Sequence, residues 1–127
     1  MTTTLTLTDN GEAMTAYLWK GDQATKGYVT HMAVGTGAAP GEIGNAHTTE
    51  IARKTVTAMV STGAGTNANK VTFEMTLLTT EGNGTITEVA LMTAASGGNM
   101  AAVASISPGV TKSDQFNLKF SWEVPFE

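Results

Sequence analysis

An apolar side chain occupies every second position of residues 116–127, the last twelve of the chain. A period of two predicts a β-strand with one buried and one wet face, because successive side chains of a strand point to opposite sides. If buried, each such side chain stabilises the fold by at most roughly 1.5–3 kcal/mol, so a second layer must cover that face. Pro125 has no N–H and places the strand end at a sheet edge. The apolar members are Phe116, Leu118, Phe120, Trp122, Val124 and Phe126.

The composition favours sheets over long surface helices. Only 14% of the 127 residues are charged, whereas Thr occurs 23 times and Gly 14 times. Thr fits the pleated surface of a strand, and Gly fits tight turns. A chain of this length can bury its own core, so we expect a single domain over residues 1–127.

The charge pattern argues against several classes of protein. The net charge is −4, and the seven basic residues are scattered except for the pair Arg53–Lys54, which is unlike a phosphate-binding surface. We therefore expect no nucleic-acid partner. There is no cysteine, so disulfides and thiolate zinc sites are excluded. No apolar run approaches about 20 residues and no basic, signal-like start is present, so we expect no membrane partner.

The first eight residues form a distinct segment. Thr alternates with Leu5 and Leu7 over residues 2–8, which predicts a short strand or an extended arm. As a strand, it would lie at the edge of the chain's own sheet. As an arm, it would reach a neighbouring subunit, and its candidate partner contacts are Thr3, Leu5 and Leu7.

A short helix is expected next. Asp9 can cap its start and Glu12 can bond back in a capping box, and the helix would end at Trp19 or Lys20 with Gly21 as its C-cap. One face carries an apolar stripe of Met14, Tyr17 and Leu18, which we interpret as cover for the core.

The middle of the chain contains further strand patterns separated by turn residues. Segments 51–60 and 71–77 would form a hairpin around a loop of about nine residues, and 85–93 is apolar on both faces, which indicates full burial or a bulge between Ile86 and Val89. Pro108–Gly109 would end the strand that begins at residue 100. The predicted fold is mainly β: an antiparallel β-sandwich with one short N-terminal helix. The strand segments are 28–34, 51–60, 71–77, 85–93, 100–106 and 116–127.

A glycine-rich loop, Gly35–Gly41, follows the first of these strands but does not fit phosphate. The spacing is GxGxxxG, no Lys-Ser/Thr pair follows, and Pro40 interrupts any helix that would direct its N–H groups at an anion. We interpret the loop as a turn.

The search for catalytic or metal-binding residues finds no convincing constellation. His31 and His47 lack metal-ligand spacing, and no serine lies in a GxSxG elbow. Glu74 and Glu88 lie on predicted strands and could be neighbours, but two solvated acids are the simpler interpretation. Catalytic, cofactor and metal sites are therefore each expected to be none. The aspartates and turn serines also lack a catalytic or metal-binding pattern: Asp9, Asp22, Asp114, Ser61, Ser96 and Ser113.

Five stretches occur in a characteristic order: LTDNGE at 7–12, HMAVGTGAAP at 31–40, EIARK at 50–54, ITEVALMTAASGG at 86–98 and KSD at 112–114. In this order they resemble a family of small tailed-bacteriophage virion proteins. Ala90, Met92 and Thr93 stand where that family usually has Gly, Phe and Asp. The resemblance implies a structural part of the capsid surface, the tail or the tail fibre. It implies no enzyme activity and no cofactor.

The resemblance predicts a non-enzymatic virion structural protein that decorates the capsid in many copies, with a tail or tail-fibre component as the alternative. Its partners would be a major capsid or tail protein and further copies of itself, assembled in the host cytoplasm. A different class is a host-glycan-binding module, for which Tyr17, Trp19 and Tyr28 are the aromatic residues outside the predicted sheet core. A hydrolase with dispersed catalytic residues is the weakest alternative.

Overall fold

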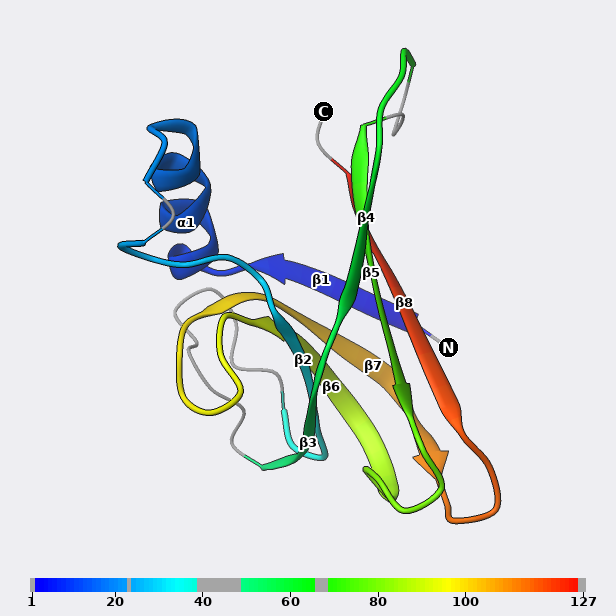
Figure 1. The fold of residues 1–127 in the computed structure, drawn as a ribbon. Helices are drawn as coiled ribbons and strands as arrows, with labels where there is room; N and C mark the ends of the chain where they lie inside the picture. The colour runs from blue at the N-terminus through cyan, green and yellow to red at the C-terminus, as the bar shows by residue number, and fades with distance from the viewer. Residues whose placement is uncertain (1, 23, 39–48, 66–68, 126–127) are drawn as a thin grey trace.

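The structure is a computed structural model that describes residues 2–22, 24–38, 49–65 and 69–125. Within them, two antiparallel sheets face each other and one helix, α1 (Asp9–Trp19), lies beside them (Figure 1). The predicted fold, a mainly β antiparallel sandwich with one short helix, is confirmed. Sheet A has the order β1 (Thr2–Leu7), β7 (Met100–Lys112), β6 (Gly84–Met92), β2 (His31–Gly35) and β3 (Glu50–Thr55). Sheet B has the order β4 (Thr57–Ser61), β5 (Lys70–Leu77) and β8 (Leu118–Pro125).

The terminal strand β8 has the alternation that its sequence predicts. Its even-numbered side chains pack partly buried against the core, and its odd-numbered side chains are exposed. Pro125 ends this edge strand, as expected from its missing N–H. The prediction was wrong for Phe116, which precedes the strand, is 42% exposed and lies with its ring 5.8 Å from Lys112 Nζ. Phe126 lies outside the described residues.

The main core fills the space between the sheets. Sheet B contributes Phe73, Met75 and Leu77, and α1 contributes Met14. A second cluster consists of side chains that alternate with core residues of sheet A: Ala33, Ala90, Met92, Met100 and Val103. Strand β6 is thus buried from Glu88 to Met92, and its register shifts between Ile86 and Glu88. Full burial and a bulge were alternatives for this segment, and the structure has the burial together with a register shift whose extra residues lie on β7.

The predicted strand 51–60 is in fact two strands in different sheets. β3 ends at Thr55 and β4 begins at Thr57, so the chain crosses from sheet A to sheet B at Val56. The Val56 N–H donates to the Thr30 carbonyl oxygen at 3.0 Å. Alternation continues through the crossing because both strands are extended, so a period of two does not reveal it. The β4–β5 hairpin is confirmed, with Ser61 opposite Lys70.

Strand β7 continues through Pro108 instead of ending there. On its β6 side, residues 106–109 face Thr87 alone, so this stretch bulges away from the ladder. A proline inside a bulge does not remove a ladder hydrogen bond, which is why the strand resumes. The pairs that flank the bulge are Ile86–Val110 and Glu88–Ser105.

Helix α1 is capped by Thr8, not by Asp9 as expected. The Thr8 Oγ1 accepts from the Gly11 N–H at 3.0 Å and also contacts the carbonyl oxygens of Met100 and Ala101. This buried residue therefore caps the helix and fixes it to β7. The helix is followed by the C-cap Lys20, and Gly21 comes next with φ 89°, so the predicted C-cap was one residue late.

The apolar stripe of α1 is only partly core cover. Met14 is 4% exposed, but Leu18 is 42% exposed. In the part of the chain that the structure describes, no helix has the length and apolar character needed to cross a bilayer.

Candidate functional site

A groove of about 530 Å³ lies where α1 and the end of sheet B diverge. Met14 and Leu18 form the helix wall, and the opposite wall comes from sheet B. The floor is sheet A, through Leu91, Ala101 and Ala102. The lining from sheet B consists of Ala58, Val71, Phe73, Val124 and Pro125.

The chemistry of the groove is apolar. None of its described lining residues is charged. Three large side chains at the groove stay substantially in water: Leu7 at 45%, Leu18 at 42% and Tyr28 at 55% exposed. Exposed apolar side chains gathered at one concave place are typical of an interaction surface, whereas single scattered ones are not informative. The groove can therefore accept an apolar surface but offers no charged group to fix an anion or cation.

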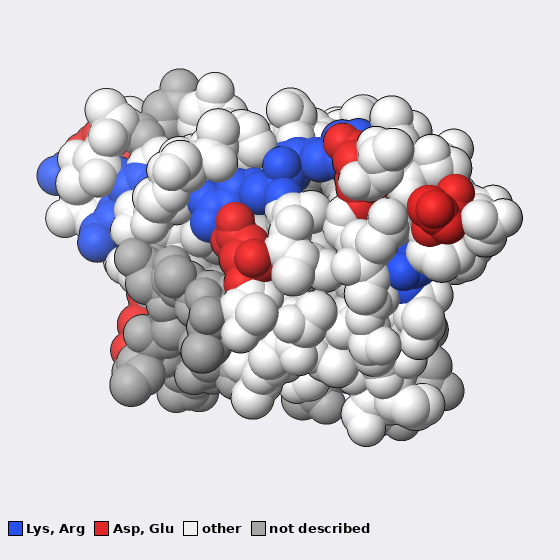
Figure 2. All heavy atoms as spheres, turned by 90° about the horizontal axis from the view of Figure 1, so that it is seen from below, with Lys and Arg blue, Asp and Glu red and all other residues white. Residues whose placement is uncertain are grey.

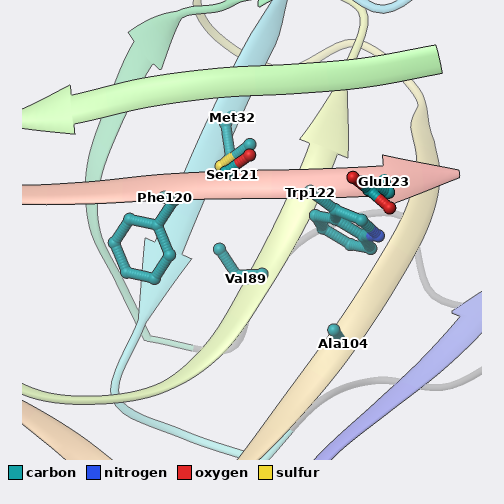
Figure 3. Close-up of a pocket in the computed structure, with 7 residues that line it drawn as sticks. All are labelled: Met32, Val89, Ala104, Phe120, Ser121, Trp122 and Glu123. Atoms are coloured by element: carbon teal, nitrogen blue, oxygen red, sulfur yellow. The ribbon is translucent and has the colours of Figure 1, made fainter. Parts of the chain in front are cut away.

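A second pocket of about 310 Å³ lies beneath the edge strand β8. Phe120 and Trp122 extend from β8 over Val89 and Ala104 of sheet A (Figure 3). Glu123 is the one ionisable residue among its lining residues. Its carboxylate pairs with Lys70 Nζ at 3.2 Å, and among the described residues no second carboxyl group lines the pocket to make the pair that glycoside hydrolysis uses.

The predicted partner contacts lie on β1, which pairs with β7 of the same chain. Thr3 lies opposite Ile106 and Leu5 opposite Ala104. The segment is thus an edge strand of sheet A, which is one of the two forms expected from its sequence. Leu7 ends the strand and lines the apolar groove. Contact of Thr3, Leu5 and Leu7 with another subunit stays a prediction.

The ionisable residues considered from the sequence do not come together. Glu74 lies on sheet B, where its carboxylate is 2.7 Å from Lys119 Nζ, whereas Glu88 is buried on sheet A. His31 Nδ1 is 2.8 Å from the hydroxyl of Thr30, and His47 lies outside the described residues. Among the described residues, no group of three or more His, Asp or Glu could hold a metal ion.

The aspartates have local structural roles. Two hydrogen bonds from Thr25, one from its hydroxyl and one from its N–H, lower the pKa of Asp22. Asp9 lies in the first turn of α1, where a carboxylate interacts favourably with the positive end of the helix dipole. Asp114 accepts a hydrogen bond from the Gln115 side chain at 2.9 Å. None of these contacts joins two aspartates in one site.

The glycine-rich segment is described as far as residue 38. Gly35 ends β2 and lies against the Glu88 side chain, whose Cγ would be 2.8 Å from a β-carbon at that position. The carbonyl oxygen of Gly37 accepts from the Thr87 hydroxyl at 2.6 Å. The loop therefore begins with a close approach to β6, which only glycine permits.

Two basic residues hold turns together, and the sequence alone did not indicate these roles. Lys112 is 2% exposed, and its Nζ donates to Asn83 Oδ1 at 2.8 Å and to the Ser113 carbonyl oxygen at 3.0 Å. It thereby joins the β5–β6 turn to the β7–β8 turn. Arg53 Nη1 donates to the carbonyl oxygens of Ala94 and Gly97 at 3.0 and 2.8 Å. No periodic pattern in the sequence indicates either role, because each depends on contacts with turns that are distant in the sequence.

Charges on the lower end of the molecule are mixed in sign. Figure 2 shows basic and acidic side chains beside one another on this face. Arg53 pairs with Glu50 at 2.7 Å and Lys54 pairs with Glu81 at 2.8 Å. Nucleic-acid surfaces differ, because they cluster unpaired Lys and Arg.

Besides Phe116, the exposed aromatic residues in the described part of the chain are Trp19 and Tyr28. Trp19, the last residue of the helix, is 89% exposed, and Tyr28 at the groove is 55% exposed. Tyr17 is partly buried. A tryptophan in water offers a flat apolar face for stacking.

Comparison with curated proteins and with solved structures gave no match. A protein family described as podophage GP4 fiber I protein gp80 matches residues 7–121. The matched segment begins at the end of β1, includes α1 and reaches into β8, so it contains almost the whole sandwich. The chain therefore belongs to the podophage GP4 fiber I protein gp80 family and is a bacteriophage virion structural protein.

Proposed function

We propose that this chain is a non-enzymatic part of a bacteriophage fibre, present in several copies and held by other virion proteins. The observation that carries the proposal is the family match over residues 7–121, because the description of that family names a fiber protein. Assembly into the virion in the host cytoplasm belongs to the same proposal, as does the lack of a nucleic-acid or membrane partner.

The distribution of apolar surface supports a role in assembly. Leu7, Leu18 and Tyr28 are exposed at one uncharged groove. Proteins that act as parts of larger assemblies bury such surfaces against their neighbours. The basic residues Arg53, Lys54 and Lys112 are engaged with turns and a surface ion pair and do not converge on a cleft.

Locating the protein on purified virions tests the proposal. Gold-labelled antibodies raised against the purified chain should mark the fibres, and the protein should be found by mass spectrometry in a detached-fibre fraction. A virion preparation that lacks this protein is the control for the antibody. Absence from the fibre fraction, with the protein recovered in another fraction, would contradict the proposal.

Capsid decoration is the second candidate, and the small size of the described elements is compatible with it. The described residues form an 11-residue helix and strands of at most 13 residues, with no coiled coil or repeated shaft. A decoration protein needs only such a small domain. Gold label spread over the head, with none on the fibres, would establish this candidate in place of the first.

A host-glycan-binding role is supported by the exposure of Trp19 at 89%. Stacking of a sugar ring on this side chain predicts that Trp19→Ala abolishes binding on a glycan array while the chain stays folded. Leu78→Ala is a matched control, because Leu78 is also an exposed apolar side chain, at 48%. Binding that survives Trp19→Ala, or no binding by the unmodified chain, would remove this role.

The non-enzymatic part of the proposal has its own test. A broad hydrolase screen on the purified chain is expected to show no turnover. Turnover that copurifies with the chain through several independent separation steps would contradict it.

A further inference from the structure

The four edge strands of the sandwich differ in how they are protected. Unprotected edges pair with other chains, and proteins usually blunt them with charges, prolines or bulges. Edge strand β3 carries Glu50, Arg53 and Lys54, and edge strand β8 carries Lys119, Glu123 and Pro125. Edge strand β4, with the sequence TAMVS, has no charge, no proline and no register shift along Thr57–Ser61. β1 is also uncharged and serves as the comparison strand below.

Strand β4 is exposed on both faces. All five of its residues are exposed, with Met59 at 49% and Val60 at 72%. Val60 lies opposite Val71, whose side chain packs against the core, so Val60 points toward the inner side of sheet B. It stays in water because the β4–β5 hairpin projects beyond sheet A (Figure 1). The edge therefore combines an unpaired backbone with a valine whose inner side no layer covers within the described residues.

We propose that β4 is a self-association surface at which two copies of this chain pair antiparallel across a two-fold axis. The two three-stranded sheets then form one sheet with the order β8-β5-β4-β4-β5-β8. Full overlap of the two five-residue strands sets the register, because any slip reduces the number of paired residues. Met59 then lies opposite Met59 of the second copy, Thr57 opposite Ser61, and Ala58 opposite Val60.

The chemistry of the edge suits pairing with a second copy of this chain. The two-fold pairing places hydroxyl side chains opposite hydroxyl side chains and Ala opposite Val, with no like charges in contact. An isologous contact of this kind requires a self-complementary patch, which the TAMVS strand provides. The shared edge is short compared with a standard interface, so the dimer is expected to be reversible on its own and to be reinforced where copies are held together. This inference does not depend on whether the chain lies on fibre or capsid.

Disulfide trapping tests the register in the full chain. The chain has no cysteine, so one introduced thiol is a unique probe. Directly opposed residues of antiparallel strands lie within the span of a disulfide. Under mild oxidation, Met59→Cys should form covalent dimers at least about tenfold faster than Ser121→Cys, an exposed position on the outer face of β8, because pairing raises the local thiol concentration.

A mixing experiment separates this register from random collision. Thr57→Cys and Ser61→Cys should each cross-link slowly alone, because residues four positions apart on a strand are separated by roughly 13 Å. Mixed together, the two variants should form a heterodimer quickly. Equal rates for the mixture and the separate variants would overturn the two-fold register. Faster cross-linking of Thr4→Cys than of Met59→Cys would move the interface to β1 and overturn the proposal.

Sedimentation of the unmodified chain gives an independent test without cysteine. Its weight-average mass should rise with concentration toward that of a dimer. Val60→Lys should lower that rise, and Val60 is exposed enough that the variant should keep its circular dichroism spectrum and melting temperature. A chain that stays monomeric at high concentration and also fails to cross-link through Met59→Cys, or that pairs through β4 only with a different virion protein, would refute self-association.

Discussion

The α-carbon of Gly11 lies against the backbone of Ala101, so close that a β-carbon at Gly11 would be 2.8 Å from the Ala101 carbonyl carbon. In an exposed helix, replacing Gly by Ala stabilises by about 0.5–1 kcal/mol. Here we expect Gly11→Ala to destabilise by about 2 kcal/mol or more, because α1 must move away from β7. Urea unfolding measures this change, with Glu12→Ala as the control on the exposed side of the same turn. A stabilised Gly11→Ala variant would show that the contact is looser than described.

The helix cap gives a second prediction. Thr8→Ala should lower the free energy of unfolding by about 1–2 kcal/mol or more, because the Gly11 N–H loses its acceptor and the contact with β7 is lost. Thr8→Ser keeps the hydroxyl and should cost less, while Asp9→Ala should cost only a few tenths through the helix dipole. Thermal unfolding of the three variants ranks them. If Asp9→Ala were the most damaging, Asp9 and not Thr8 would be the cap.

Two lysines provide a matched comparison between a buried and an exposed site. Lys112→Met should lower the free energy of unfolding by about 2 kcal/mol, because the buried lysine loses its charged hydrogen bonds to the Asn83 amide oxygen and the Ser113 carbonyl oxygen. Lys119→Met, which removes only an exposed pair with Glu74, should cost less than about 1 kcal/mol. Chemical denaturation of both variants measures the difference. Equal losses would mean that Lys112 does not hold the two turns together.

The lowered pKa of Glu81 leads to a predicted pH dependence of stability. A hydrogen bond from Lys54, followed by one from the Leu78 N–H, lowers its pKa in the folded chain below the ordinary 4.5. Because the folded value is the lower one, the stabilisation is present above about pH 4.5 and is lost as pH falls through the folded pKa. The stability difference between the unmodified chain and Glu81→Gln should therefore shrink below that pH.

Unfolding at a series of pH values measures this difference. Lys54→Met is the control background, because it removes the main partner of Glu81. In that background, the effect of Glu81→Gln on stability should depend less on pH. A difference that grows on acidification would contradict the sign of the Glu81 shift.

The elements predicted correctly are those that depend on nearby residues. The alternation at Leu118, Phe120 and Trp122 predicted β8, because the face that a side chain occupies depends only on its position along the strand. The β4–β5 hairpin followed for the same reason. The cap was displaced by one residue because Thr8 and Asp9 are both good capping residues, and the contact of Thr8 with β7 decided between them.

The features that could not be predicted depend on residues distant in the sequence. Val56 marks a change of sheet, but nothing in a period of two distinguishes one sheet from another. Pro108 is accommodated by a bulge that depends on the β6 register. The groove requires Leu18 and Val124 to lie on opposing walls, which is a consequence of tertiary packing. Leu7 was named from the sequence as a contact residue, and the structure places it in that groove.

The crossing at Val56 has a mechanical consequence. Residues 50–61 contribute β3 to one sheet and β4 to the other with a single residue between them. A force applied to either sheet is therefore transmitted to the other sheet at this point along the main chain, through peptide bonds instead of side-chain contacts. A particle component loaded at β4 would transmit tension straight into β3, and the two layers could not be drawn apart there without first unravelling a strand.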